Sequence, residues 1–104
     1  MERTQLLREL RERLEAAHGS RLAGVVLYGS EARGEAGPDS DIDVLVLLNG
    51  PVDSWRDLRV SIEALYPLVL ELERPIHPKP VAADVYEAGE FPLYRRVKAE
   101  GVPA

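Results

Sequence analysis

The sequence predicts an α/β protein with a small mixed sheet of three or four strands flanked by helices. Two short apolar runs, Leu22–Tyr28 and Ile42–Leu48, have the length and the β-branched content of buried strands. Around them lie longer segments whose apolar residues recur every three or four positions, which is the spacing of amphipathic helices. Each apolar run is followed within two residues by a glycine, where the chain can turn.

Length and composition narrow the class of protein. With 104 residues the chain has the size of one domain, so we expect a single domain over 1–104. Hydrophobic residues make up 45% and charged residues 30%, which excludes a disordered chain. The net charge of −5 argues against direct binding of nucleic acid, which needs a basic surface. No apolar run approaches the roughly 18 residues of a membrane span, and the polar start is no signal peptide, so we expect a cytoplasmic protein.

The first element is expected to be an amphipathic helix over residues 4–17. Thr4 is its expected N-cap and Gly19 its expected end. His18, beside that end, is expected to be an ordinary surface histidine and not a ligand. The spacing predicts one buried stripe, made of Leu6, Leu7, Leu10 and Leu14.

The strand Leu22–Tyr28 should stop at Gly29 and Ser30. Glycine lets the backbone turn sharply and brings its N–H groups close to a phosphate, and the Ser30 hydroxyl adds a donor. A brief helix through residue 33 should follow, with Ser30 as its cap. Capping and phosphate binding use the same exposed helix N-terminus, so the two roles of Ser30 are compatible.

After this turn, residues 35–40 are expected to form a loop, because they contain a Gly-Pro pair. Arg33, just before the loop, has two roles open to it. Its guanidinium could bind a phosphate, or it could brace the loop by pairing with Asp39. The residues alone do not decide between these roles.

Two acids, Asp41 and Asp43, stand at the start of the second apolar run. Alternate residues of a strand point the same way, so the two carboxylates should lie side by side. Such a pair could merely cap the preceding loop, but with Gly29 and Ser30 eleven residues upstream we expect a metal site. Carboxylate oxygens completed by substrate phosphates, in a chain without cysteine, favour Mg²⁺. Beyond Asp43 the strand is apolar on both faces and should be central.

A long helix should follow, capped by Asp53 or Ser54. Pro67 either kinks this helix on its way to about residue 73 or ends it at Tyr66, and we favour the kinked helix. Its core stripe is expected to consist of Trp55, Leu58, Ile62, Leu65, Tyr66 and Val69.

The last third of the chain predicts an edge strand and two short helices. Three prolines within six positions confine the strand over 76–83 to a sheet edge, with His77 and Lys79 on one face. Asp84 has the form of a capping box that opens a short helix. The final helix, Pro92–Glu100, should end at Gly101 and turn Leu93, Tyr94 and Val97 inward.

Three groups of residues together resemble the signature of the nucleotidyltransferase superfamily that includes DNA polymerase β. They are Gly29-Ser30, Ala32-Arg33-Gly34 and Ser40-Asp41-Ile42-Asp43, and the short chain is most similar to the minimal nucleotidyltransferases, the MNT-type proteins. The C-terminal residues 91–102 also resemble the ending of that family. The resemblance implies the palm-like fold of the superfamily.

The resemblance also implies a reaction and roles for residues. A hydroxyl would attack the α-phosphate of a nucleoside triphosphate, ATP being the expected one, and release pyrophosphate. Asp41 and Asp43 would hold Mg²⁺, while the β- and γ-phosphates would lie at Gly29 and Ser30, with Arg33 and Ser40 completing the nucleotide site. Relatives of this kind generally add a third carboxylate from a later strand, and the candidates for it are Asp84, Glu71 and Glu73.

Two classes of function remain open at this point. The first is an enzyme resembling the MNT antitoxins, which modify a helical HEPN-type toxin, and such a partner protein would supply the recognition that so short a chain lacks. The second is a nucleotide-binding or partner-binding module with reduced or no activity. His77 and Lys79 stand on the edge strand where a third acid would be expected, so nucleotide binding is better supported than turnover.

Overall fold

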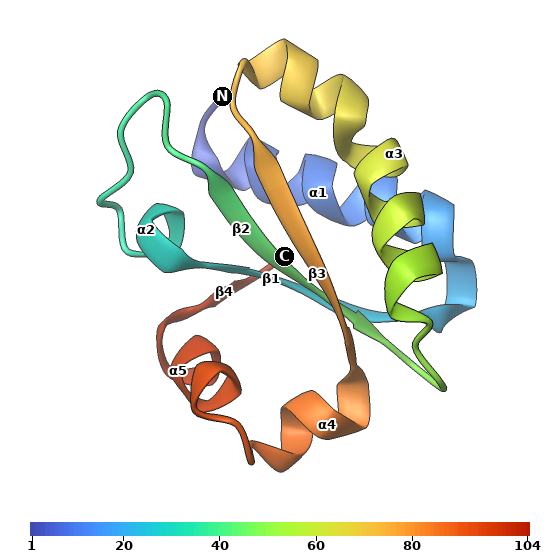
Figure 1. Ribbon diagram of the computed structural model, residues 1–104. Coiled ribbons are helices and arrows are strands. Elements are labelled where there is room, and N and C mark those ends of the chain that lie inside the picture. The colour runs from blue at the N-terminus through green and yellow to red at the C-terminus, as the bar shows by residue number, and fades with distance from the viewer.

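The computed structural model describes all residues, 1–104, and shows the predicted α/β fold with a four-stranded mixed sheet. The strands lie in the order β3-β2-β1-β4; helices α1 and α3 cover one face of the sheet, and α4 and α5 lie on the other (Figure 1). None of the helices is long and apolar enough to cross a membrane. The elements are α1 (Arg3–His18), a 3₁₀ turn (Gly19–Arg21), β1 (Leu22–Tyr28), α2 (Gly29–Ala32), β2 (Ile42–Leu48), α3 (Ser54–Leu72), β3 (Ile76–Ala82), α4 (Ala83–Ala88), α5 (Pro92–Glu100) and β4 (Val102–Pro103).

Strand β2 is the centre of the sheet, as predicted. It runs antiparallel to β1 and parallel to β3, and every residue after Asp43 is buried. Alternate residues belong to two different cores: Val44 and Val46 pack beneath α1 and α3, while Leu45 and Leu47 pack toward α4 and α5. Burial on both faces explains why this strand is a continuous apolar run and not an alternating one.

Helix α1 buries Leu6, Leu10 and Leu14 of the expected stripe and partly buries Leu7, but its N-cap and the placement of His18 differ from the prediction. Its N-cap is Glu2 and not Thr4, because the Glu2 carboxylate accepts hydrogen bonds from the backbone N–H groups of Thr4 and Gln5 at 3.1 and 2.8 Å. The helix ends at Gly19 as expected, with a φ of +61°. The prediction of a surface His18 was wrong, since this side chain is buried against α3.

Helix α3 begins after its cap Asp53 and continues through Pro67, as predicted. Half of the predicted core stripe was wrong. Leu65 is buried and Leu58 and Val69 are partly buried, but Trp55, Ile62 and Tyr66 are exposed. The helix has two apolar faces, and the buried face consists of Asp57, Ser61, Leu65 and Leu68. Its two polar residues can be buried because Ser61 bonds to His18 and Asp57 bonds to Arg21.

Strand β3 forms one edge of the sheet, as its prolines indicated. Pro78 and Pro80 stand opposite Val44 and Val46 of β2. The other edge is β4, which was not expected because two residues give no periodicity to read. It pairs with β1 through Val102 and places the C-terminal residue beside the sheet.

The short helices correct two predicted caps. Helix α2 begins at Gly29, with Tyr28 in the N-cap position and no side-chain cap, so Ser30 does not cap it. Helix α4 begins at Ala83, which places Asp84 within the first turn, where its carboxylate accepts only from the N–H of Val85. Helix α5 has the predicted bounds and turns Leu93, Tyr94 and Val97 toward the core beneath α4 and α5.

Candidate active site

One row of three residues crosses the sheet at the end of β1. Tyr28 is the last residue of β1, it stands opposite Asp43 of β2, and Asp43 in turn stands opposite His77 of β3. Partners in neighbouring strands point to the same face, which here is the face of α4 and α5. The register therefore places the second predicted acid between an aromatic ring and an imidazole.

Gly29 follows this row and lies directly against Asp43. Its φ is +74°, and a Cβ added to it would lie 2.7 Å from Oδ2 of Asp43. That separation is too short for any real Cβ, so a side chain at this position would displace the carboxylate. Glycine is thus required twice, for the turn and for the close approach to the acid.

The predicted carboxylate pair is present, and a histidine joins it. Asp41 is exposed just before β2, and its Oδ2 lies 3.1 Å from Nε2 of His77, within hydrogen-bonding distance. Burial raises the pKa of Asp43, the charge of Asp41 raises it further, and His77 acts in the opposite direction. The two acids are close enough to repel each other, which is the electrostatic situation that a divalent cation relieves.

Arg74 holds the two halves of the site together, and the sequence analysis did not identify it. Its Nε donates to the carbonyl oxygen of Ser40 at 2.9 Å, and its Nη2 donates to Oε2 of Glu31 in α2 at 2.5 Å. The guanidinium therefore ties the turn after β1 to the loop that ends at Asp41. The sequence feature that could have identified Arg74 is its position between α3 and the edge strand. That position points to the site only when β3 is known to lie beside β2.

The other nucleotide-site candidates lie around this turn. Ser30 is half-buried in α2, and the Oγ of Ser40 accepts from the N–H of Gly37 at 2.9 Å, so it shapes the loop. Arg33 does not pair with Asp39; it pairs with Glu35 at 3.2 Å and reaches Glu100 at 3.8 Å. A hollow of about 170 Å³ lies next to them, lined by Tyr28, Gly29, Arg33, Leu93, Arg96, Val97 and Glu100.

None of the three candidates for a third carboxylate joins the pair. Asp84 follows the far end of β3, which is parallel to β2, so about 20 Å of strand separates it from the acids. Glu71 and Glu73 are exposed where α3 ends. The position opposite Asp43 on β3 is instead taken by His77.

The residues present fit a Mg²⁺ ion that is shared with a substrate. No group of three His, Cys, Asp or Glu side chains is placed to hold a metal unaided. Mg²⁺ is commonly bound by one or two carboxylates, with water and substrate phosphates as the other ligands. The absence of a side chain at Gly29 lets the Asp43 carboxylate lie directly beside the turn after β1.

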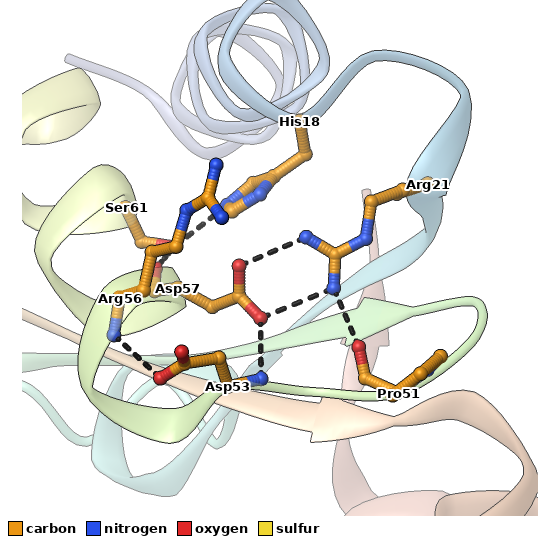
Figure 2. A network of polar contacts seen from close by, with 7 residues as sticks. All are labelled: His18, Arg21, Pro51, Asp53, Arg56, Asp57 and Ser61. Carbon is orange, nitrogen blue, oxygen red and sulfur yellow. Dashed lines mark hydrogen bonds and ion pairs between the residues drawn. The ribbon is translucent and has the colours of Figure 1, made fainter.

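A second polar cluster has the residue types of a hydrolase site but the contacts of a brace (Figure 2). Nε2 of His18 lies 2.8 Å from Oγ of Ser61, and that hydroxyl donates to the backbone carbonyl of Asp57 at 2.8 Å. The Ser61 hydrogen is thus already used, so His18 is the donor and cannot act as a base toward this serine. Arg21 donates two hydrogen bonds to the Asp57 carboxylate, at 2.9 and 3.1 Å, and the cluster fixes the end of α1 and the 3₁₀ turn that follows it to α3.

Comparison with known proteins identifies the fold and the family of the chain. The fold is similar to a chain in the crystal structure of a toxin–antitoxin with AMP-PNP, at a TM-score of 0.63 and 19% identity, over 93% of this chain and 70% of that one. A candidate nucleotidyltransferase from Sulfolobus solfataricus, solved at 1.40 Å, matches at a TM-score of 0.49 and 24% identity, over 96% and 79% of the two chains. No curated protein matches the sequence. The sequence pattern of the nucleotidyltransferase domain, however, matches residues 7–101, and the chain belongs to that family.

Proposed function

We propose that this chain, acting as one nucleotidyltransferase domain, binds a nucleoside triphosphate with Mg²⁺ and transfers its nucleotidyl group to a hydroxyl. The observation that carries the proposal is the contact between Gly29 and Asp43, beside Asp41. A phosphate-binding turn and a pair of metal-binding acids are useful together only if one ligand carries both phosphates and a metal.

In this proposal the triphosphate lies along the turn after β1. The backbone N–H groups at Gly29 and Ser30 and the Ser30 hydroxyl hold the β- and γ-phosphates. Ser40 shapes the facing loop, and the Arg33 guanidinium, which is on the surface with only exposed acids as partners, can exchange them for a phosphate. The rest of the nucleotide lies toward the hollow beside Arg96, and ATP is the expected nucleotide.

Asp41 and Asp43 would hold the metal. When bound, Mg²⁺ would neutralise the charge that develops on the transferring phosphate and on the departing pyrophosphate. His77 orients the Asp41 carboxylate through its hydrogen bond, and Arg74 orients the loop that carries it. The chain therefore contributes placement and charge, and no covalent intermediate is required.

The transfer balances as a single displacement at phosphorus. The oxygen of the acceptor hydroxyl bonds to the α-phosphorus while the bond from that phosphorus to the bridging oxygen breaks, and pyrophosphate leaves with the electron pair. The hydroxyl proton passes to a carboxylate of the pair or to water. Holding the attacking and leaving oxygens in line accounts for most of the rate gain that such a site can give.

The acceptor that we propose is a helical partner protein of the HEPN toxin type, with this chain as its antitoxin. Support comes from the fold shared with a toxin–antitoxin structure that contains a nucleotide analogue. A second function is favoured by one observation: His77 occupies the position on β3 where a third acid would complete the metal site. On that alternative the chain binds nucleotide or partner and has reduced or no transfer activity.

The test is a pair of measurements on the same variants. Adding Mg²⁺ and ATP at about 100 times Kd should stabilise the native chain by about 2.7 kcal/mol, which raises the melting temperature of a domain of this size by roughly 10 °C. The Asp41→Asn, Asp43→Asn double variant should lose this rise, while the control Asp39→Asn should keep it. An equal rise in the double variant would place the nucleotide elsewhere.

Transfer of labelled nucleotide to a co-purified HEPN-type partner then distinguishes the two functions. Labelling that needs both acids supports the enzyme. Binding without labelling supports the module.

A further inference from the structure

Helix α3 presents a row of large apolar side chains to solvent. Trp55, Ile62, Tyr66 and Leu70 are 74, 47, 56 and 60% exposed. At about 100° of turn per residue these four positions and Arg59 fall within an arc of about 80°. They form one continuous strip, here called the outer strip, on the side of α3 that faces away from the core. Apolar residues gathered on one helix face in this way mark an interaction surface.

The outer strip contains a hollow shaped for a side chain from another helix. The hollow has a volume of about 120 Å³ and is lined by Trp55, Leu58, Arg59 and Ile62. These four residues have the spacing i, i+3, i+4 and i+7. Four residues of that spacing form the hole that receives one side chain in knobs-into-holes helix packing.

We infer that the outer strip binds the outer strip of a second copy of this chain, with the two α3 helices antiparallel. Laid antiparallel about an axis between positions 62 and 63, Trp55 faces the partner's Leu70, and Arg59 faces the partner's Tyr66. The two Ile62 side chains meet at the axis. Every position of the strip thereby finds another position of the strip, and Tyr66 is the knob that enters the partner's hole.

The charges on the outer strip and directly beside it are also self-complementary. Arg59 and Glu63 form no ion pair within the chain. In the antiparallel pair, Glu63 lies within about one helical turn of the partner's Arg59, so two symmetric ion pairs form. The Arg59 guanidinium also faces the ring of the partner's Tyr66, a favourable cation–π arrangement. A single basic residue and a single acidic residue close to the axis suit a two-fold contact.

The pairing leaves the candidate active site open. Helix α3 covers the face of the sheet opposite to α4 and α5 (Figure 1). The strand register places Asp43 on the side of α4 and α5, and Gly29 lies against Asp43. Each copy in the dimer can therefore bind nucleotide and an acceptor. Helix α3 has 19 residues and is about 28 Å long, so two such faces bury an area at the low end of specific interfaces, and the dimer should depend on concentration.

The first test is sedimentation equilibrium of the full chain over a wide range of concentration. We expect a monomer–dimer equilibrium. Ile62→Glu should raise the dimer dissociation constant by about 100-fold or more, because each dimer would bury two carboxylates at its axis. Val85→Glu, an equal change at an exposed apolar residue of α4, is the control and should leave the equilibrium unchanged. A chain that stays monomeric at its solubility limit, or a dimer that Ile62→Glu does not weaken, would overturn the inference.

The second test separates a second copy from a different partner. Arg59→Glu alone and Glu63→Arg alone should each weaken the dimer, and the two changes in one chain should restore it, because the swapped charges again face each other. The chain has no cysteine, so Ile62→Cys should give a disulfide-linked dimer on oxidation, whereas Val85→Cys should not. Failure of the double variant to recover, or equal cross-linking at both positions, would show that the outer strip serves another partner.

Discussion

Gly29 and Asp43 meet across the first two strands so closely that no side chain fits between them. We expect Gly29→Ala to destabilise the chain and to impair nucleotide binding, because the added methyl group meets Oδ2 of Asp43 at 2.7 Å and the backbone has a positive φ. The backbone strain alone should cost about 1 kcal/mol. Urea unfolding and calorimetry with Mg²⁺ and ATP measure the two effects.

The control for this variant is Gly34→Ala. Gly34 has the same φ, +74°, but nothing lies within 4 Å of an added Cβ. This variant should lose only the stability that the backbone strain costs, about 1 kcal/mol, and should keep its nucleotide affinity. If the two variants bind nucleotide equally well, the contact between Gly29 and Asp43 has no role in binding.

Arg74 should matter for binding more than for folding. Arg74→Met keeps an apolar stem but removes the donors to Ser40 and Glu31, so the loop before Asp41 loses its anchor. We expect about tenfold weaker binding of Mg²⁺ and ATP, a loss typical of one charged hydrogen bond. Arg8→Met on the exposed face of α1 is the control. Calorimetry that gives equal affinities for both variants would refute the positioning role.

Changes at His77 and at Asp84 should have different effects on nucleotide binding. His77→Ala removes the hydrogen bond to Asp41 and should weaken metal-dependent nucleotide binding severalfold. Asp84→Asn should change neither the affinity nor nucleotide transfer, since Asp84 follows the far end of β3, and its stability should change by less than about 0.5 kcal/mol. Titrations with Mg²⁺ and ATP measure the affinity of both variants. A loss of nucleotide transfer in Asp84→Asn would contradict the argument from distance.

The polar cluster of His18, Arg21, Asp57 and Ser61 should make the stability of the chain depend on pH. Burial lowers the pKa of His18 below 6.5, with Asp57 raising it and Arg21 lowering it. The folded chain then binds fewer protons than the unfolded chain just below pH 6.5, so the free energy of unfolding should fall as the pH decreases through that value toward the folded pKa. His18→Gln keeps a donor for Ser61 but does not titrate. Urea unfolding at about pH 7.5 and pH 5 should show a smaller decrease for this variant.

The strands and the acid pair were predictable because each depends on residues close together in the sequence. Leu22–Tyr28 and Ile42–Leu48 are strands with the predicted bounds, since short apolar runs that end at turn signals are typical of buried strands. Gly29-Ser30 and the two acids were expected in one site because they stand eleven residues apart, each at the edge of an apolar strand. The pairing of Tyr28 with Asp43 shows how the antiparallel register brings them together.

The errors come from contacts between distant elements. The buried face of α3 was misassigned because Asp57 and Ser61 read as polar, and their burial depends on Arg21 and His18, about 40 residues earlier. Arg74 and His77 became part of the site only through the parallel register of β2 and β3. Periodicity indicates that one face of an element is buried, but it does not identify the element that packs against that face.

The prolines of β3 also bear on how the chain avoids aggregation. Proline has no N–H, and Pro78 and Pro80 stand at alternate positions of β3, where a donor would face away from β2. The ladder to β2 uses the intervening positions, such as Lys79, and so loses nothing to the prolines. An incoming strand would meet carbonyl acceptors with almost no donors, which prevents the edge-to-edge growth that an open sheet otherwise invites. The opposite edge, β4, is only two residues long and also contains a proline. Both open sides of the sheet are thus unsuited to adding further strands, and self-association is left to the helices.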